Sequence, residues 1–299
     1  MRQPKALTDW MRRLRELCVV LLSGALWVVS VEPAISQQTD SQAIRVKQGE
    51  VFYLALSSPE PITSSYIMFR GKTIPVFQLQ PRGTYGALVG VDLDEAPSRY
   101  DLEVFGAGQP QRYVVEVVSA NFGIQELTLP QDKVELDEET LKRVEEEQEN
   151  ILRSLSPVTT EKLWEGKFIV PVEGKVVGSF GLKRILNGQP RSPHSGEDFT
   201  APQGTAVRAA NTGKVALVGE YFFSGKSVIV DHGLGCYTMY FHLQDIGVEE
   251  GDLVQKGAVI GSVGATGRAT GPHLHWGARV NGARVNPLSM IDLEEASGP

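Results

Sequence analysis

The 299-residue sequence predicts a mostly β protein with an N-terminal β-sandwich, a connecting helix and a C-terminal antiparallel β domain. Three observations predict this fold class. Short β-favouring runs separated by turn formers recur along most of the chain. Glycine is unevenly distributed, with 22 of the 31 glycines from Gly166 onward, which indicates a second, turn-rich β region. Between the two regions, one acidic segment carries apolar residues at helical spacing.

The first 36 residues have the composition of an export signal. Basic residues precede an uncharged, mostly apolar run of 15 residues, 17–31, and Ala34-Ile35-Ser36 resembles a small-residue cleavage site. A membrane-spanning helix needs roughly 20 apolar residues. Glu32 ends this run too early, so we predict that residues 1–36 are a cleaved signal peptide and that an uncleaved membrane anchor is the alternative.

Charge and cysteine content exclude other classes. The net charge is −7 and no block of Lys and Arg follows the first 15 residues, so no nucleic-acid partner is expected. Without the signal, Cys236 is the remaining cysteine and has no disulfide partner. We interpret Cys236 as a small buried residue rather than a nucleophile, because a thiol protease would need its own positioned base.

Residues 40–120 are predicted to form the β-sandwich. The strand candidates include 51–56, 65–69 and 113–118, each bounded by turn formers. This segment contains no His and no Cys, so we expect it to bind or scaffold, with an envelope protein as its possible partner.

Residues 121–163 are predicted to be a linker that carries the acidic helix. Asp137 or Glu138 suits the helix start. The apolar residues that can share one face are Leu141, Val144, Ile151, Leu152 and Leu155. The acidic run is typical of a solvated helix face, although a regulatory element is the alternative interpretation.

Residues 164–299 are predicted to form the second β domain. The strand candidates are 168–172, 206–209, 215–218, 227–230, 238–242 and 274–280, punctuated by glycines. The glycine-rich stretch 261–267 lacks the Gly-Lys-Ser/Thr ending of a phosphate-binding loop, which favours tight turns.

All five histidines lie in this second domain. His194 and Asp198 offer nitrogen and carboxylate ligands within one short segment, and both suit zinc, although the pair alone is more often a surface turn. His273 and His275 flank Leu274 in a predicted strand, so their side chains should share one face.

His242 lies on another predicted strand, with Tyr240 expected on the same face. Each motif alone fits ordinary surface or hydrogen-bonded histidines, but together the three supply metal ligands and spare bases. His232, between two strands, is interpreted as a turn residue.

Residues 166–288 resemble the lysostaphin-type, or LytM-type, zinc metallopeptidases of bacterial cell walls. The resemblance rests on His194-x-x-x-Asp198, Tyr240-x-His242-Leu243 and the segment 267–275, Gly-Arg-x-Thr-Gly-Pro-His-Leu-His. Residues 198–205, 231–233 and 285–288 are also similar to the family. One departure is Trp276-Gly277, where many members carry an aromatic residue followed by Glu.

The resemblance implies a LytM-type catalytic domain in which His194, Asp198 and His275 bind Zn²⁺ and leave a fourth position for water. His242 and His273 then correspond to the catalytic histidines. It further implies an endopeptidase of the periplasm or cell envelope that cuts cross-links or bridges between peptidoglycan stem peptides, with a D-alanyl cross-link favoured.

Two other functions stay open. Some relatives of this family have lost zinc ligands and activate other cell-wall hydrolases, so a non-catalytic LytM-like activator is the main alternative. A carbohydrate-binding or structural envelope protein would make the three motifs coincidental. The presence of all five residues favours the enzyme. A separate hypothesis is that residues 43–160 restrain the groove until a partner or the cell wall displaces them.

Overall fold

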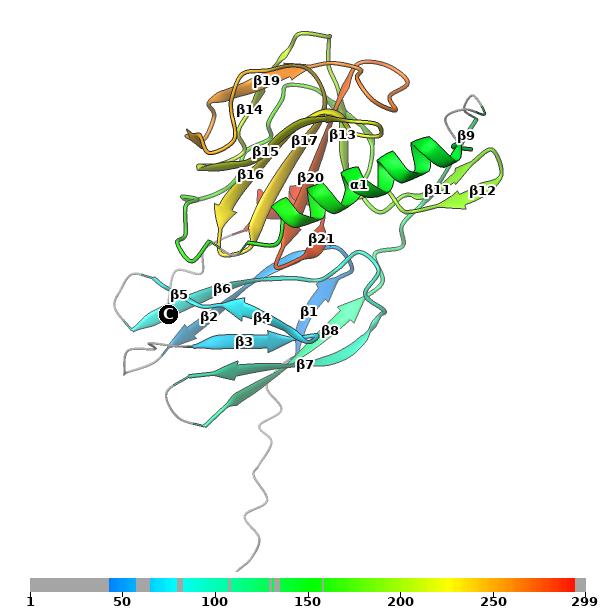
Figure 1. Cartoon of the computed structure of the whole chain (residues 1–299). Coiled ribbons are helices and arrows are strands. Elements are labelled where there is room, and N and C mark those ends of the chain that lie inside the picture. The colour runs from blue at the N-terminus through cyan, green and yellow to red at the C-terminus, as the bar shows by residue number, and fades with distance from the viewer. Residues whose placement is uncertain are drawn as a thin grey trace, which may run out of the picture. The chain divides into compact units, whose positions relative to one another are not determined.

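The computed structural model in Figure 1 describes residues 43–57, 65–79, 83–106, 109–128, 131, 135–157 and 159–293. The predicted signal peptide lies outside these residues. Residues 40–299 form one compact unit. Within the described ranges, no helix has both the length and the apolar character needed to cross a membrane. The prediction of a mostly β chain is confirmed.

The N-terminal strands form two sheets over one core. The first sheet has the order β1-β8-β7-β3-β4 and the second has the order β2-β6-β5. The strand bounds are β1 (Ile44–Lys47), β2 (Val51–Ser57), β3 (Tyr66–Phe69), β4 (Lys72–Pro75), β5 (Phe77–Gln78), β6 (Thr84–Gly90), β7 (Ser98–Phe105) and β8 (Gln111–Val118). Ile67, Leu102 and Val115 of the first sheet share a buried cluster with Ala87 and Val89 of the second. Two sheets over one core is the arrangement that a β-sandwich requires.

The acidic segment forms helix α1 (Glu138–Ser154), and of the two residues predicted to suit its start, Asp137 is the N-cap. The Asp137 side chain accepts a hydrogen bond from the Thr140 backbone N–H at 2.7 Å, which satisfies one donor of the first turn. Glu138 and Glu139 follow in that turn, where negative charge favours the helix dipole.

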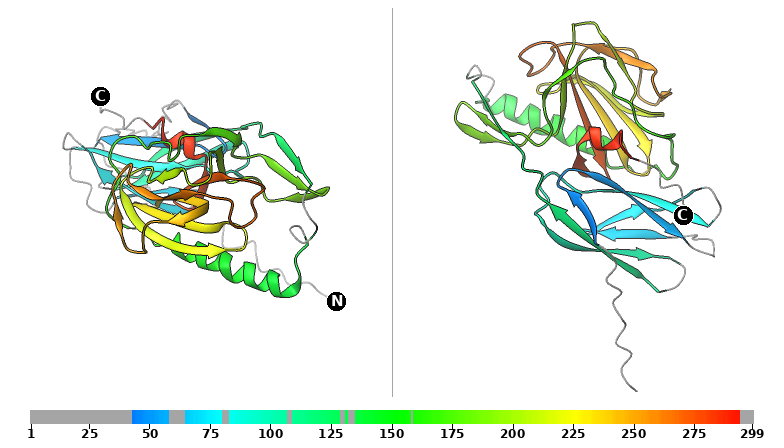
Figure 2. Two further views of the ribbon diagram at one scale, coloured as in Figure 1. Left: turned by 90° about the horizontal axis from the view of Figure 1, so that it is seen from above. Right: turned by 180° about the vertical axis from the view of Figure 1, so that it is seen from behind.

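One side of α1 packs on the C-terminal sheet. Ile151 and Leu155 contact a buried cluster made of Leu217, Tyr221, Ile229, Tyr237 and Met239. Figures 1 and 2 show the helix lying along this part of the sheet. Leu141 and Leu152 are 47% and 43% exposed, so only part of the predicted apolar face is buried.

The acidic face of α1 is not wholly solvated, which corrects the sequence interpretation. Glu147 accepts a hydrogen bond from the Phe222 backbone N–H at 2.7 Å, and its other carboxylate oxygen accepts one from Arg143 Nε. Phe222 lies in the turn that precedes β16 (Gly225–Gly233). The carboxylate of Glu147 therefore links the helix to a turn of the C-terminal domain.

The C-terminal domain is built on a ten-stranded sheet whose pairs are all antiparallel. Its main order is β10-β13-β20-β17-β16-β15-β18, with β14, β19 and β21 at its borders. The remaining bounds are β10 (Lys175–Gly178), β13 (Gly196–Thr200), β14 (Ala206–Arg208), β15 (Gly213–Tyr221), β17 (Cys236–Ile246), β18 (Leu253–Val254), β19 (Val259–Val263), β20 (His273–Val280), β21 (Ala283–Val285) and the 3-10 helix η2 (Pro287–Met290).

Two local predictions in this domain are wrong. Residues 168–172 form no strand: Phe168 and Val172 are buried, but Ile169 N–H bonds to Ala210 O in a loop contact and Pro171 has no N–H to donate to a ladder. The glycine-rich stretch is not entirely turns, because Gly261 lies within β19.

A small fourth sheet joins the predicted linker to the C-terminal domain. Its order is β12-β11-β9, with β9 (Ile124–Leu127), β11 (Lys183–Leu186) and β12 (Gln189–Arg191). β9 pairs in parallel with β11, so the register sets Gln125 opposite Arg184. Residues 124–127 are therefore part of the C-terminal architecture rather than a free linker.

An ion-pair cluster ties the loop after β6 to β21. Arg284 donates to Asp92 Oδ1 at 2.6 Å and to Asp94 Oδ2 at 2.7 Å, and its backbone N–H donates to Asp92 Oδ2. Nearby, Asn281 Nδ2 donates to Leu88 O at 2.8 Å. Leu88 also belongs to the C-terminal core cluster.

We predict that Asp92→Asn destabilises the protein by about 1–3 kcal/mol at pH 7. Burial acts to raise the Asp92 pKa, but the hydrogen bonds and charge of Arg284 outweigh it and hold that pKa below its usual range. A carboxylate with a lowered folded-state pKa stabilises above its unfolded pKa of about 4 and loses this contribution as the pH falls through the folded value. In urea denaturation, the gap between wild type and Asp92→Asn should therefore narrow below about pH 4. A gap that stays constant with pH would contradict this assignment.

We also predict that Ile151→Ala destabilises the protein by about 1–2 kcal/mol, because this side chain packs on the sheet. Leu152→Ala is the matched control: its side chain is 43% exposed, so its effect should stay within about 0.5 kcal/mol. Urea denaturation of both variants measures the difference. Equal losses of stability in the two variants would show that α1 packs through another face.

Candidate metal and catalytic site

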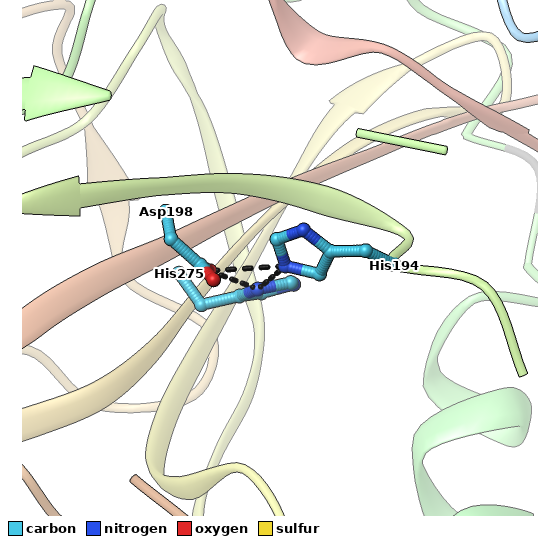
Figure 3. A group of neighbouring side chains, drawn as sticks. All are labelled: His194, Asp198 and His275. Carbon is cyan, nitrogen blue, oxygen red and sulfur yellow. Dashed lines mark hydrogen bonds and ion pairs between the residues drawn. The ribbon is translucent and has the colours of Figure 1, made fainter. Parts of the chain in front are cut away.

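The structure brings His194, Asp198 and His275 together (Figure 3). β13 and β20 are antiparallel neighbours, and their register sets Asp198 directly opposite His275. His194 comes from the loop before β13. Its Nε2 lies 3.0 Å from Asp198 Oδ1 and 3.0 Å from His275 Nδ1. Asp198 Oδ1 lies 2.8 Å from His275 Nδ1.

Glycine makes this close approach possible. A Cβ atom at Gly196 would lie 2.6 Å from His275 Nε2 and 2.6 Å from the backbone oxygen of Trp276. Both distances are far below any real contact of a Cβ atom. A larger residue at position 196 would therefore displace the imidazole of His275.

The arrangement of hydrogen-bond donors and acceptors in this cluster favours a cation at its centre. His194 Nδ1 lies 3.0 Å from Ser179 O, which can only accept, so Nδ1 carries the proton and neutral His194 presents a lone pair at Nε2. That lone pair faces Asp198 Oδ1, which is also an acceptor. Neutral nitrogen and carboxylate oxygen donors in a three-residue set are those of a catalytic zinc site, so these residues fit Zn²⁺.

Electrostatics favours the metal-binding form of Asp198 and of His275. Burial acts to raise the Asp198 pKa, but the contacts with His194 and His275 lower it far below its usual range. Burial lowers the pKa of His275 and favours the neutral imidazole. An ionised carboxylate and neutral imidazoles are the forms that bind a metal ion.

His242 and His273 lie beside this cluster. Their ring centroids are 4.7 Å apart, and the centroid of His242 is 6.2 Å from that of His275. His242 Nδ1 donates to Thr266 O and His273 Nδ1 donates to Gly271 O, each at 2.8 Å. In the neutral state both Nε2 atoms therefore carry lone pairs. Burial and the nearby His275 and His273 lower the His242 pKa to about 3.

A backbone irregularity places His242 in the site. Its φ is +63°, a left-handed value that is rare for a residue other than glycine, and the β16–β17 register shifts at this point. Such a bulge breaks the two-residue alternation of side chains. Tyr240 consequently faces the core, with its hydroxyl accepting from Ala210 N, so the prediction that it shares a face with His242 is wrong.

The predicted alternation on β20 is confirmed. His273 and His275 both line a pocket of about 840 Å³, whereas Leu274 is fully buried in the core cluster. Asp198 and His242 line the same pocket. Four of the five predicted site residues thus face one groove, and the fifth, His194, lies behind it with 1% of its surface exposed.

Sequence reasoning missed several groove residues. Gln125, Leu127 and Thr128, from β9 and the residue after it, line one part of the pocket. Arg184 of β11 and Arg268 line it as well. The parallel pairing of β9 with β11 is a long-range contact with no local sequence signal, although Arg268 falls inside the recognised segment 267–275.

His232 is a buried strand residue, which corrects its interpretation as a turn residue. It lies in β16 with 0% exposure, and its two ring nitrogens contact Thr212 O at 2.8 Å and Thr238 Oγ1 at 2.7 Å. Burial lowers its pKa to about 4, so it is neutral near pH 7. Cys236 is buried, as expected, and burial raises its thiol pKa.

Comparisons with known proteins agree with this geometry. Residues 192–287 match Peptidase family M23. A solved structure described as a peptidase M23 from Pseudomonas aeruginosa is 34% identical, with a TM-score of 0.64, and the match covers 80% of this chain and 92% of that one. The chain belongs to peptidase family M23.

Curated relatives match over shorter stretches. DD-carboxypeptidase/endopeptidase Mpg of Neisseria meningitidis is 48% identical over 135 residues, which is 40% of this chain and 31% of Mpg. Peptidoglycan DD-endopeptidase ShyC of Vibrio cholerae is 39% identical over 124 residues, which is 41% of this chain and 28% of ShyC. The matched region thus spans less than a third of either relative. Membership of family M23 and the His-Asp-His donor set confirm the prediction of Zn²⁺ as cofactor.

We predict that the purified protein binds about one Zn²⁺ per chain and that His194→Ala lowers this content severalfold, because a three-residue set loses one ligand. Elemental analysis after dialysis measures both. His273→Ala is the matched control, since this histidine lines the groove but lies outside the three-residue cluster. Undamaged protein without zinc would contradict the proposed site.

Proposed function

We propose that this M23 protein is an exported zinc metallo-endopeptidase that hydrolyses peptide cross-links or bridges of peptidoglycan. One observation carries the proposal: a cluster of three metal-type ligands, two of which line the groove, lies beside two further groove histidines whose Nε2 is unprotonated in the neutral state. Three protein ligands leave the fourth position of zinc open, as hydrolysis requires.

Each residue has a distinct role in this proposal. His194, Asp198 and His275 hold Zn²⁺, which when bound polarises a carbonyl and lowers the pKa of water. The Nε2 atoms of His242 and His273 accept a proton from the attacking water. Once protonated, they donate a hydrogen bond to the carbonyl oxygen as negative charge develops and return a proton to the leaving amine. Their Nδ1–H bonds to backbone oxygens fix both rings for this work.

The roles of His242 and His273 follow from their surroundings. Burial keeps His242 neutral, so its Nε2 can accept a proton or a hydrogen bond across the neutral pH range. His273 begins β20 two residues before His275, on the same face of the strand. The two bases therefore flank the metal-type cluster without belonging to it.

The relatives suggest the substrate. Mpg and ShyC are named as a DD-carboxypeptidase/endopeptidase and a peptidoglycan DD-endopeptidase. We infer from them that D-alanyl cross-links between stem peptides are cleaved, in the periplasm or cell envelope, after export by residues 1–36. The two-sheet region of residues 40–120 is proposed to bind an envelope protein, since its described part contains no His or Cys for chemistry of its own.

We predict that His242→Ala loses muropeptide cleavage by about 100- to 10,000-fold in kcat while its zinc content stays at the wild-type level. The physical reason is that His242 contributes proton transfer but no metal contact. Purified peptidoglycan is digested with each protein, and mass spectrometry identifies the new termini, which also names the bond that is cut.

His232→Gln is a control for loss of a buried histidine away from the groove, with circular dichroism to check its fold. Zinc-loaded wild type that leaves all peptidoglycan intact would contradict the enzyme and favour the non-catalytic activator. New amino termini in the stem peptides, absent with His242→Ala, would support the endopeptidase.

A further inference from the structure

Two arginines line the groove beside the metal-type cluster. Arg184 projects from β11, and its Nη2 lies 3.6 Å from Asp198 Oδ2. Arg268 lies in the loop before β20, and its guanidinium carbon is 4.1 Å from the ring centroid of Phe223, which also lines the groove. Arginine presents a planar set of donors that matches a carboxylate.

The backbone holds Arg268 in place. Its N–H donates to Phe223 O at 3.0 Å. The preceding Gly267 has a φ of +72°, and a Cβ there would lie 2.4 Å from Gly225 N, so this turn packs tightly against the 223–225 turn. Stacking on Phe223 and this tight turn fix the direction of the guanidinium before any ligand binds.

The charge of the groove is unlike that of the whole chain. The protein carries −7 overall. Among the described residues that line the groove, Asp198 is the only carboxylate, and it faces His194 and His275 as well as Arg184. Burial lowers the pKa of Arg268, and so does the charge of Arg184 and Arg191.

Arg184 is also incompletely satisfied. Its side chain is 27% exposed, and its Nε is buried without a hydrogen-bond partner among the described residues. An anion in the groove would be attracted by the positive charge of both arginines, which line it together.

We propose that Arg184 and Arg268 form a carboxylate-binding subsite that selects substrates with a free carboxylate next to the bond to be cut. This inference rests on the proposed function, because stem peptides supply the carboxylate. It adds two specificity-determining residues that lie outside the metal-type cluster and its flanking histidines.

The test uses two synthetic cross-linked stem peptides that differ in one respect: the carboxylates beside the cross-link are free in one and amidated in the other. Wild type should cleave the free form with a kcat/KM about tenfold or more above the amidated form, mainly through KM. Arg268→Gln should lose most of this preference, because cleavage of the free form falls much more than cleavage of the amidated form.

Two further variants sharpen the test. Arg208→Gln makes the same substitution at an exposed arginine of β14 outside the groove and should keep the full preference. Arg268→Lys should keep part of it, because lysine retains the charge but loses the planar pair of donors. Arg184 is left intact, since it also contacts Asp198.

The outcomes separate the subsite from the enzymatic proposal. Equal cleavage of both peptides by wild type, or an equal loss for both in Arg268→Gln, would overturn the subsite while leaving the endopeptidase intact. If no peptide is cleaved, calorimetry measures the affinity of the zinc-loaded protein for each uncut peptide and decides whether the subsite exists. Tighter binding of the free form, lost in Arg268→Gln, then supports the subsite although the proposed function fails.

Discussion

The pairing of β13 with β20 is the constraint on which the site depends. Its antiparallel register sets Asp198 opposite His275, and a slip of one residue would turn Leu274 toward the groove and His275 toward the core. His194 joins them because its backbone is held on both sides, with His194 N donating to Leu182 O and His194 O accepting from Gly181 N. The three-residue cluster is thus specified by backbone pairing.

The opposite face of β20 fixes that register. Leu274, Trp276, Ala278 and Val280 each have 0% exposure and belong to the main core cluster. Burying one large apolar side chain contributes about 1.5–3 kcal/mol, so a slipped register would expose several of them at a cost comparable to the stability of a domain. The same strand therefore supplies core packing on one face and two groove histidines on the other, and the first secures the second.

Sequence patterns predicted the features that depend on local periodicity or recognised motifs. They predicted a helix start at Asp137 or Glu138, the alternation around Leu274 and the placement of the five candidate site residues in one domain. They failed where tertiary structure overrides periodicity. The bulge at His242 leaves Tyr240 facing the core, and Phe168 and Val172 are buried although residues 168–172 join no ladder. The prediction that His232 is a turn residue is wrong, because burial and two hydrogen bonds, rather than its neighbours in sequence, fix its position.

The contacts of the predicted linker, residues 121–163, bear on the hypothesis that residues 43–160 restrain the groove. Gln125 and Leu127 line the groove because β9 pairs with β11, and α1 buries Ile151 on the sheet behind it. Removing residues before 164 would delete a groove wall and expose core at the same time. Altered cleavage by such a fragment would then reflect a damaged substrate site as much as a released restraint. A restraint exerted by residues 43–160 is separable only by changes that leave β9 and its pairing with β11 intact.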